Sequence, residues 1–540
     1  MSRIAAGVTH GVGRAALLIA AVTVGARVAG FGRTVVFSQT VGDTCLGTAY
    51  ITANQLPAVL FEIVIGGALT AVVVPVLAAA AGRGEREQVE HTASALLTWV
   101  LLLSVPLAGL IALSAPYAMA LMLGAGAGCD PRVLAALSVR MLLVFAPQVV
   151  FYGLAAVLYG VLQSHRRFLS PAAAPLVSSV VVICSYLLFV PLGGAYRDDP
   201  AGLPLGAELV LSLGTTAGVL ALFLTVLGPA VRLGLRWRPR LVFPPGVGRR
   251  VRSLAAASLV PLVAMQACLL LSVALANRGG GAGGSVLYSY AWALFTLPYG
   301  VIAVPIATSA FTALAVAHAD RDRGAYAELV AGPARACVVL TAAVGTALAA
   351  AALPVAQVFA RHDPVALERA LAAYAPGVVG FGLVALFSRA LYASHHGRPA
   401  AVAQTLGWLL VMVCSVVSVS LVPAGWAIAA LGWSTTVGLT CAALACTVAV
   451  GRVHGAAALA GTGRSVAAVA VGGVLGWAAG RPVAAVLAGG GVWPSVGAAL
   501  VSGALAVVVF ALVAAVVDRS SARAALDRVR SVFEHRRGNR

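Results

Sequence analysis

Two arginines, Arg27 and Arg33, stand inside a long apolar stretch, AAVTVGARVAGFGRTVVFSQTVG, at residues 20–42. Placing an arginine in the bilayer core costs at least ~2.5 kcal/mol on insertion scales, so such a residue normally faces a watery cavity or a partner. A guanidinium stays charged and binds phosphate through two parallel hydrogen bonds. The pair therefore predicts a cavity that receives an anionic, phosphate-like substrate.

The spacing of the two arginines leaves two interpretations open. Six residues on a straight helix correspond to about 9 Å of rise and roughly 120° of rotation, so the side chains would lie on different faces. Both could still reach one cavity if Gly25, Gly30 and Gly32 let the helix bend or flatten, or if the cavity is broad. Alternatively, one arginine lines the cavity and the other extends to the membrane interface. We favour the first interpretation because an unpaired arginine in hydrocarbon is so costly.

Three polar residues of the next apolar stretch, at about 48–81, are candidates for the same cavity. Glu62 is an acid deep in this segment, and it could pair with an arginine or take up a proton; a structural ion pair explains it equally well. Asn54 and Gln55 precede Pro57, so they could line the cavity or bind the carbonyl groups that the proline leaves free. The predicted substrate-binding residues are Arg27, Arg33, Asn54, Gln55 and Glu62.

The elements that must position these residues are membrane spans. Of the 540 residues, 61% are hydrophobic and only 10% are charged, whereas soluble domains carry about 25% charged residues. The apolar runs fit about 14 transmembrane helices, which predicts an all-α polytopic membrane protein. A loop outside the membrane is expected at 115–133, after a helix that ends near Ser114.

The net charge of +19 comes from arginine alone, because the chain contains no lysine. This excludes chemistry that needs a lysine, such as a P-loop or a Schiff base. The arginines gather in short loops between apolar runs, where they set topology, and this argues against nucleic acid as a partner. Every strongly basic loop falls on one side of the membrane, so both termini are predicted to be cytoplasmic.

An internal repeat divides the chain. FAPQVVFYGLAAVLYGVLQSH (145–165) is similar to YAPGVVGFGLVALFSRALYASHH (374–396). This predicts two six-helix lobes related by a pseudo-two-fold axis along the membrane normal, with two further helices. The predicted parts are an N-lobe at 1–230, a basic cytoplasmic linker at 231–252, a C-lobe at 253–450, helices 13 and 14 at 451–517, and a basic cytoplasmic tail at 518–540.

Other ionisable residues receive simpler interpretations. Arg140 and Arg389 lie nearer predicted helix ends, and we expect both to extend to the membrane interface. His165, His395 and His396 fall in predicted inside loops, where solvation is the expected state.

The eight cysteines show no CxxC or Cys/His spacing typical of a metal site. Cys45 and Cys129 fall in predicted outside loops, where they could form a disulfide or remain free thiols. No Ser/His/Asp arrangement suggests a nucleophile. The sequence thus predicts no catalytic residues, no metal and no cofactor, and a protein that is not an enzyme.

Three segments carry a family resemblance: ARVAGFGRTVVFSQTVG (26–42), AYITANQLPAVLFEIVIGGALTAVVVPVL (49–77) and LYSYAWALFTLPYGVIAVPI (287–306). They resemble the MurJ/MviN lipid II flippases of the multidrug/oligosaccharidyl-lipid/polysaccharide exporter superfamily. The resemblance covers essentially the whole chain and is most specific in these segments.

The resemblance implies a fold with a V-shaped cationic cavity that opens alternately inward and outward. It implies lipid II, the undecaprenyl-pyrophosphate-linked peptidoglycan precursor, or a related glycolipid as cargo. Arg27 and Arg33 match family arginines that contact the pyrophosphate, and the helices at 451–517 match a groove for the lipid tail. The implied location is the cytoplasmic (inner) membrane, with cell-wall synthesis proteins as candidate further partners.

The chain also departs from the family. Thr48 stands where an acid is common, and Phe61 and Ala293 stand where further cavity arginines are common. The predicted cavity is therefore less cationic than the family's. Two alternatives remain: a divergent paralogue that exports another lipid-linked glycan or a drug, and a non-transporting scaffold that recruits cell-wall enzymes.

Overall fold

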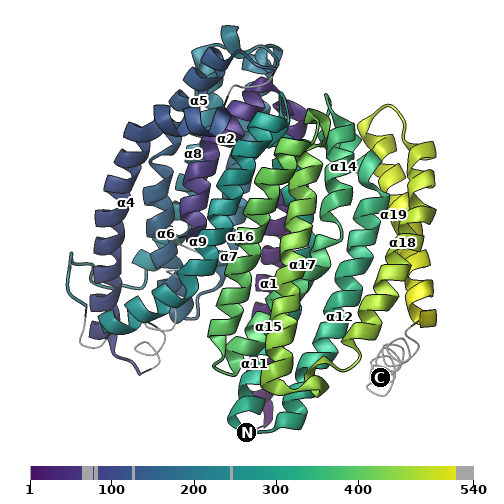
Figure 1. Ribbon diagram of the computed structural model, residues 1–540. Coiled ribbons are helices and arrows are strands. Elements are labelled where there is room, and N and C mark those ends of the chain that lie inside the picture. Colours follow the sequence, from purple (N-terminus) through teal and green to yellow (C-terminus); the bar gives the residue numbers. More distant parts are fainter. Residues whose placement is uncertain (1, 64–76, 78–82, 125–127, 244–246, 518–540) are drawn as a thin grey trace. The chain divides into compact units, whose positions relative to one another are not determined.

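The computed structural model describes residues 2–63, 77, 83–124, 128–243 and 247–517 (Figure 1). All regular secondary structure in these ranges is helical. Eleven described helices are long and apolar enough to cross a membrane, or up to twelve if Pro364–Tyr374 and Gly377–Ala393, which meet at a 41° bend, form one span. The predicted all-α polytopic membrane fold is confirmed, and the predicted tail at 518–540 lies outside the described residues.

The chain forms two compact units, Met1–Val286 and Leu287–Arg540. The helix at Val247–Gly279 belongs to unit 1, whereas the predicted C-lobe begins at residue 253, and the predicted lobe boundaries stay a prediction.

Unit 1 is built from long helices that pack mainly as α7 with α8 and α1, α4 with α6, and α2 with α5. A further helix, α9, packs against α2 and α4. The bounds are α1 Ser2–Thr40, α2 Cys45–Phe61, α4 Arg86–Leu123, α5 Pro131–Phe145, α6 Gln148–Ser164, α7 Leu169–Gly193, α8 Leu205–Val231 and α9 Val247–Gly279, with 3₁₀ turns at Gly194–Tyr196 and Pro200–Gly202.

Two helices of unit 1 begin at a residue whose side chain caps the helix. Thr44 precedes α2, and its hydroxyl accepts the Gly47 backbone N–H at 3.0 Å. Asp130 precedes α5 and accepts the Arg132 backbone N–H at 2.8 Å, with Pro131 as the first helical residue. Both are preferred arrangements at helix N-termini.

The predicted end of the third span was wrong. Helix α4 continues through Pro116 to Leu123, and the loop expected at 115–133 is reduced to the residues before Pro131. A proline inside a membrane helix removes one hydrogen bond but is tolerated because neighbouring helices support the backbone. Pro116 is therefore a weaker stop signal here than in a soluble protein.

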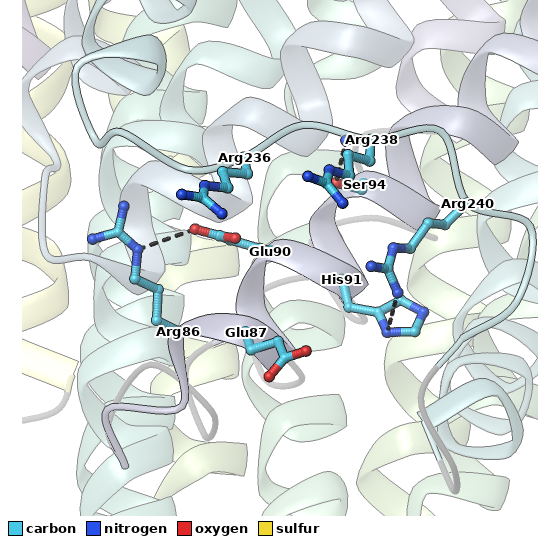
Figure 2. A pocket seen from close by; sticks show the side chains of 8 residues that line it. All are labelled: Arg86, Glu87, Glu90, His91, Ser94, Arg236, Arg238 and Arg240. Atoms are coloured by element: carbon cyan, nitrogen blue, oxygen red, sulfur yellow. Dashed lines mark hydrogen bonds and ion pairs between the residues drawn. The ribbon is translucent and has the colours of Figure 1, made fainter.

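The first part of the predicted basic linker is an extended segment. Residues 235–243 follow α8 without regular secondary structure and run beside α4, as Figure 2 shows for Arg236, Arg238 and Arg240. Helix α9 then begins at Val247, inside the range predicted as linker.

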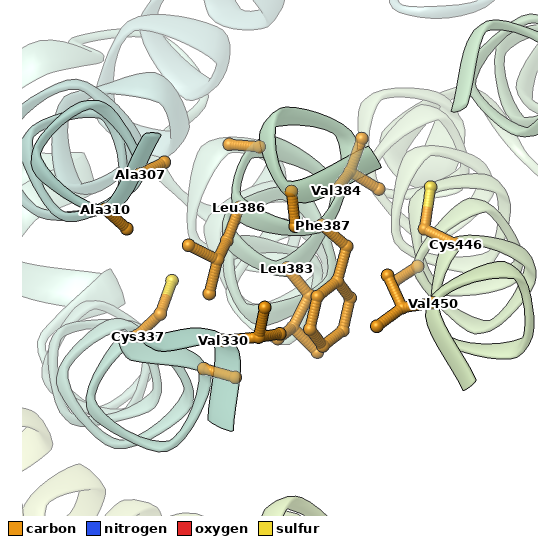
Figure 3. Close-up of a cluster of buried hydrophobic side chains, with 14 of the residues drawn as sticks. Ala307, Ala310, Val330, Cys337, Leu383, Val384, Leu386, Phe387, Cys446 and Val450 are labelled. Carbon is orange, nitrogen blue, oxygen red and sulfur yellow. The ribbon is translucent and has the colours of Figure 1, made fainter. Parts of the chain in front are cut away.

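Unit 2 has a core of small and apolar side chains from several helices, part of which Figure 3 shows. Phe387 of α15 lies between Val330 of α12 and Val450 of α17, and Ala307 of α11 belongs to the same buried cluster. The bounds are α10 Gly284–Pro298, which begins at the boundary between the units, a π-helical turn at Tyr299–Ala303, α11 Val304–Ala319, α12 Arg323–Ala350, α13 Ala352–Phe359, α14 Pro364–Tyr374, α15 Gly377–Ala393, α16 Gly397–Leu421, α17 Ala427–His454, α18 Thr462–Leu487 and α19 Val492–Val517, with 3₁₀ turns at Ala424–Trp426 and Ala456–Leu459.

The two copies of the internal repeat have the same local structure. Helix α5 ends at Phe145 and α14 ends at Tyr374, and both aromatic rings are fully buried. An Ala-Pro pair follows in each copy, and the next helix, α6 or α15, begins directly after the proline. The proline lacks an N–H and so fits a helix start, which explains why the break recurs at the same place.

The two helices predicted at 451–517 are present as α18 and α19. They pack against each other and against α12, and Figure 1 shows this group in yellow and green. Gly472, Gly476 and Gly480 lie one turn apart on α18 and permit this close approach: a Cβ on Gly476 would come within 2.6 Å of the Ala506 carbonyl oxygen of α19. Small residues at such spacing are typical of close helix packing in membranes.

Candidate functional site

The two arginines of the first helix are exposed and unpaired. Helix α1 is continuous from Ser2 to Thr40, and Arg27 and Arg33 are both exposed along it. Neither side chain has a hydrogen bond or a close ion pair within the described residues. On a continuous helix the six-residue spacing places them on different faces.

Glu62 is an electrostatic neighbour of Arg27. It caps the C-terminus of α2, where the helix passes into a π-helical turn, and its side chain is exposed. The Arg27 guanidinium lies within Coulombic range of the Glu62 carboxylate, without a direct contact between them in the described part of the chain. A carboxylate at this position offsets part of the positive charge that an anionic cargo would meet.

Tyr152 of α6 is a neighbour of both Arg33 and Glu62, and it was not among the residues predicted from the sequence. Arg33 and Glu62 both lie within Coulombic range of its hydroxyl, and the Phe61 ring packs on the Tyr152 ring with centroids 4.1 Å apart. The signal that could have found Tyr152 is its place inside the internal repeat, where an aromatic residue, Phe381, stands at the equivalent position.

The C-terminal half of α1 is fixed by a buried aromatic cluster. Phe37, one turn after Arg33, contacts the rings of Tyr50 and Tyr186 at centroid distances of 5.2 and 5.3 Å. The Tyr50 hydroxyl forms hydrogen bonds with the hydroxyls of Tyr186 at 2.8 Å and Thr215 at 2.7 Å. This network joins α1, α2, α7 and α8, and it therefore holds Arg33 at a defined height in the unit.

Asn54 and Gln55 lie about two turns before the π-helical end of α2. Both are half-buried, and neither has a side-chain hydrogen bond among the described residues. Pro57 lies within the helix and is buried. The two amides are thus free to meet a ligand or the carbonyls near Pro57, and both predicted roles stay open.

Unit 2 repeats part of this arrangement. Helix α10 ends at a Leu-Pro pair and, like α2, passes into a π-helical turn, in which the Tyr299 ring stacks on Phe381 of α15 with centroids 3.7 Å apart. Arg389 lies about two turns after Phe381 on α15. It is half-buried, and its guanidinium donates a hydrogen bond to the Ala385 carbonyl at 3.3 Å. It is within Coulombic range of the Tyr299 hydroxyl. π-Helical turns are frequent at functional sites.

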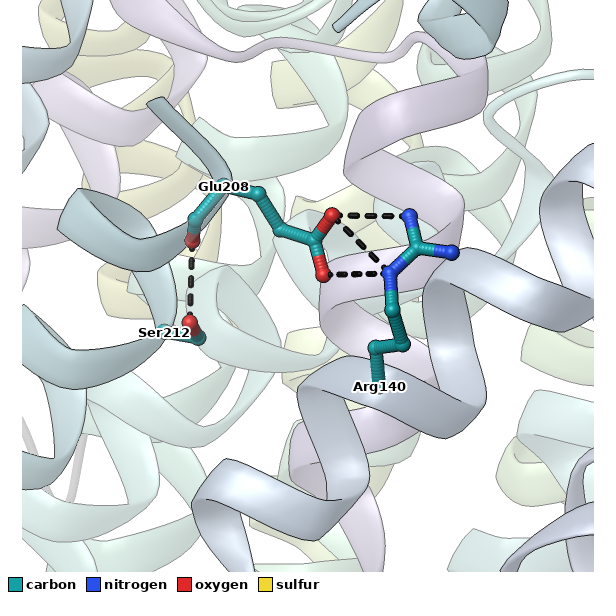
Figure 4. Close-up of polar contacts among 3 residues, drawn as sticks. All are labelled: Arg140, Glu208 and Ser212. Atoms are coloured by element: carbon teal, nitrogen blue, oxygen red, sulfur yellow. Dashed lines mark hydrogen bonds and ion pairs between the residues drawn. The ribbon is translucent and has the colours of Figure 1, made fainter. Parts of the chain in front are cut away.

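The sequence suggested that Arg140 extends to the membrane interface, but in the structure this side chain has a partner. Its guanidinium forms a two-pronged ion pair with Glu208 in the first turn of α8, with contacts of 2.7 and 2.9 Å (Figure 4). The Glu208 side chain is only 5% exposed, whereas that of Arg140 is 53% exposed. The pair joins α5 to α8 and is a structural link rather than a cargo contact.

Cys45 and Cys129 form a disulfide, with Cα atoms 5.8 Å apart. It links the first residue of α2 to the loop before α5. The exposed His395 and His396 agree with the solvated state expected for them. Within the described residues, no group of three or more histidine, cysteine, aspartate or glutamate side chains could hold a metal ion.

Comparisons with known proteins show the family of this chain. The family described as "Lipid II flippase MurJ" matches residues 37–486. A probable lipid II flippase MurJ of Rhizobium meliloti is 26% identical over 389 residues, covering 70% of this chain and 69% of the relative. The lipid II flippase MurJ of Burkholderia cenocepacia is 25% identical over 393 residues, with 70% and 73% covered.

Two solved structures share the fold. One is "Lipid II flippase MurJ, inward closed conformation", with a TM-score of 0.73 at 16% identity, covering 93% of this chain and 99% of that one. The other is an inward-facing MATE family transporter of the MOP superfamily, with a TM-score of 0.61 at 14% identity and coverages of 81% and 94%. With the family match extending over most of its length and this transporter fold over nearly all of it, the chain belongs to the MurJ lipid II flippase family.

Proposed function

We propose that this protein moves lipid II from the inner to the outer leaflet of the cytoplasmic membrane by alternating access. The observation that carries the proposal is the pair of exposed guanidinium groups, Arg27 and Arg33, on a continuous helix and without bonded partners in the described residues. Guanidinium groups on two faces of α1 favour a headgroup with more than one phosphate, because each can form paired hydrogen bonds with one phosphate.

The surrounding groups suit a reversible site. Glu62 near Arg27 lowers the local positive potential, so the cargo is held less tightly than by arginines alone. Tyr152 and Phe61 supply an aromatic surface beside Arg33. The return of an empty, positively charged site would respond to membrane potential, since one charge crossing the field is worth about 2.3 kcal/mol per 100 mV.

The arrangement in the membrane is part of the same proposal. The arginine-rich loops favour a cytoplasmic location for both termini. The helices α18 and α19, with the long exposed apolar side chains of α19, would form the groove for the polyprenyl tail. Cell-wall synthesis proteins are proposed as partners through the basic loops.

A second candidate is the export of another lipid-linked glycan. The observation that favours it is Phe61, which packs against Tyr152 where the family resemblance implies a cavity arginine. A site with fewer arginines would suit a headgroup with less negative charge.

The test is complementation of a strain depleted of its lipid II flippase. We would compare the wild type with Arg27→Ala and Arg33→Ala, and use Arg232→Ala, an exposed arginine after α8, as the matched control. Rescue by the wild type and the control, with loss for both site variants at equal membrane levels, is expected. Rescue by both site variants would contradict the diphosphate role, and no rescue by a well-expressed wild type would favour the second candidate.

A further inference from the structure

A basic pocket of about 600 Å³ lies in unit 1 (Figure 2), and none of the residues proposed to bind the cargo lines it. It is formed by the first turns of α4 and by the extended segment at 235–243. Four arginines line it, Arg86, Arg236, Arg238 and Arg240, against two glutamates.

The segment that carries three of these arginines is held in place by an alternating pattern. Leu235 is buried, and Trp237 and Phe243 pack against the same apolar cluster beside α4 and α6. Arg236 and Arg238, which alternate with them, are exposed on the opposite side. Alternate residues of an extended chain point to opposite faces, so burial of one set presents the other set to the pocket.

Hydrogen bonds fix this segment to α4. The backbone N–H of Arg238 donates to the Ser94 hydroxyl at 3.2 Å, and that of Arg240 donates to the Thr98 hydroxyl at 3.1 Å. The Trp99 indole donates to the Leu241 carbonyl at 2.9 Å. The pocket is thus a built site whose arginines are held by their backbone.

The charges of the pocket are only partly compensated. Glu90 accepts a hydrogen bond from Arg86 at 3.0 Å, and Arg240 contacts the His91 ring nitrogen at 3.1 Å. The guanidinium groups of Arg236 and Arg238 have no hydrogen bond or ion pair in the described part of the chain, and Arg236 is a Coulombic neighbour of Glu90. Within the described residues, both guanidiniums thus keep their donors available in one pocket, and a guanidinium can bind a phosphate group through two parallel hydrogen bonds.

The position of the pocket points to a lipid phosphate. The pocket covers the first turns of α4, and just beyond it the helix exposes Trp99 and then Leu102 and Leu103. Tryptophan is enriched at the membrane interface, and exposed leucines on a spanning helix face the acyl chains. The pocket therefore lies at about the depth of the headgroups.

We propose that this pocket binds the phosphate group of an anionic membrane phospholipid through Arg236 and Arg238. The site is separate from the cargo-binding residues, so it does not depend on the function proposed above. Such a lipid would hold the segment between α8 and α9 against α4.

The experiment measures binding of short-chain phosphatidylglycerol to the purified full chain in a neutral detergent, with phosphatidylcholine and inorganic phosphate as comparison probes. We expect phosphatidylglycerol to bind and the double variant Arg236→Gln/Arg238→Gln to bind about thirty-fold more weakly. The control Arg232→Gln, in the same basic segment but outside the pocket, should stay within about two-fold of the wild type.

A second variant is expected to strengthen phosphatidylglycerol binding rather than weaken it. Glu87 lines the pocket and is exposed, so Glu87→Gln removes a repulsive charge and should tighten phosphatidylglycerol binding about five-fold. Unchanged binding in both the double variant and Glu87→Gln would overturn the proposal. Inorganic phosphate that binds as tightly as phosphatidylglycerol would overturn the assignment to a lipid.

Discussion

The Asn277 amide group donates one hydrogen bond to the Thr52 hydroxyl at 2.9 Å and another to the Met122 carbonyl at 3.1 Å. One buried side chain near the end of α9 thus joins α2 and α4. This link explains why α9, which the sequence assigned to the second lobe, packs within unit 1.

We expect Asn277→Leu to destabilise the protein by about 1–2 kcal/mol, because interhelical hydrogen bonds in membrane proteins are worth about 0.6–2 kcal/mol. Thermal unfolding of the purified protein in detergent would measure the loss. Each change alone also leaves a buried partner group unsatisfied. A double-mutant cycle with Thr52→Val is therefore needed to measure the interaction energy between Asn277 and Thr52. Strictly additive effects of the two changes would mean that the hydrogen bond contributes nothing.

The ion pair of Arg140 and Glu208 should respond unequally to loss of either partner. Arg140→Met leaves a buried carboxylate without its partner, and removal of one partner from a buried pair costs about 3–5 kcal/mol. Glu208→Gln leaves an arginine that is 53% exposed and can be hydrated, so a smaller loss is expected. Unfolding temperatures of the two variants would compare them, and a larger loss for Glu208→Gln would contradict this account.

The disulfide between Cys45 and Cys129 predicts both a stability effect and a topology. Replacing both residues with serine should cost about 2–4 kcal/mol of unfolding free energy, because the bond restricts the unfolded chain. Cys184→Ser, at a free and exposed cysteine, is the control and should have little effect. After mild reduction of intact cells, a membrane-impermeant maleimide should label Cys45 and Cys129 in a variant that lacks the other cysteines. Labelling only after the cells are opened would place this loop on the inside.

The glycines of α18 provide a test of the packing between α18 and its neighbouring helices. Gly476→Ala would place a methyl group 2.6 Å from the Ala506 carbonyl oxygen and 2.8 Å from a Thr346 methyl, so the helices must separate. A loss of about 1–3 kcal/mol in unfolding free energy is expected, as for other overpacked sites. Gly463→Ala is the control, because a Cβ there meets nothing within 4 Å. Equal stability of both variants would show that α18 and α19 are not packed so closely.

Most helices could be predicted from the sequence because apolar runs and arginine-rich loops alternate. Two boundaries differ: α9 begins inside the predicted linker, and α4 continues past Pro116, because a proline is tolerated inside a membrane helix where neighbouring helices support the backbone. The repeat also predicted a real structural equivalence, that of Phe145 and Tyr374 before their Ala-Pro breaks.

The polar contacts could not be predicted in the same way. Arg140 and Glu208 are 68 residues apart, and no local pattern shows that their helices meet. The roles of the predicted residues Arg27, Arg33, Asn54, Gln55 and Glu62 stay predictions, although the structure makes Arg27 a neighbour of Glu62. The basic linker did carry a usable signal, because Leu235 and Trp237 alternate with Arg236 and Arg238.

The disulfide between Cys45 and Cys129 in unit 1 can form only at a certain stage of protein synthesis. Its two cysteines are separated by 84 residues, so at about 5–20 residues per second they leave the ribosome roughly 4 to 17 s apart. Oxidation requires that both have crossed to an oxidising compartment. The bond can therefore close while the ribosome is still making α9, and a chain produced in a reducing cell-free extract would reach the same stage without it.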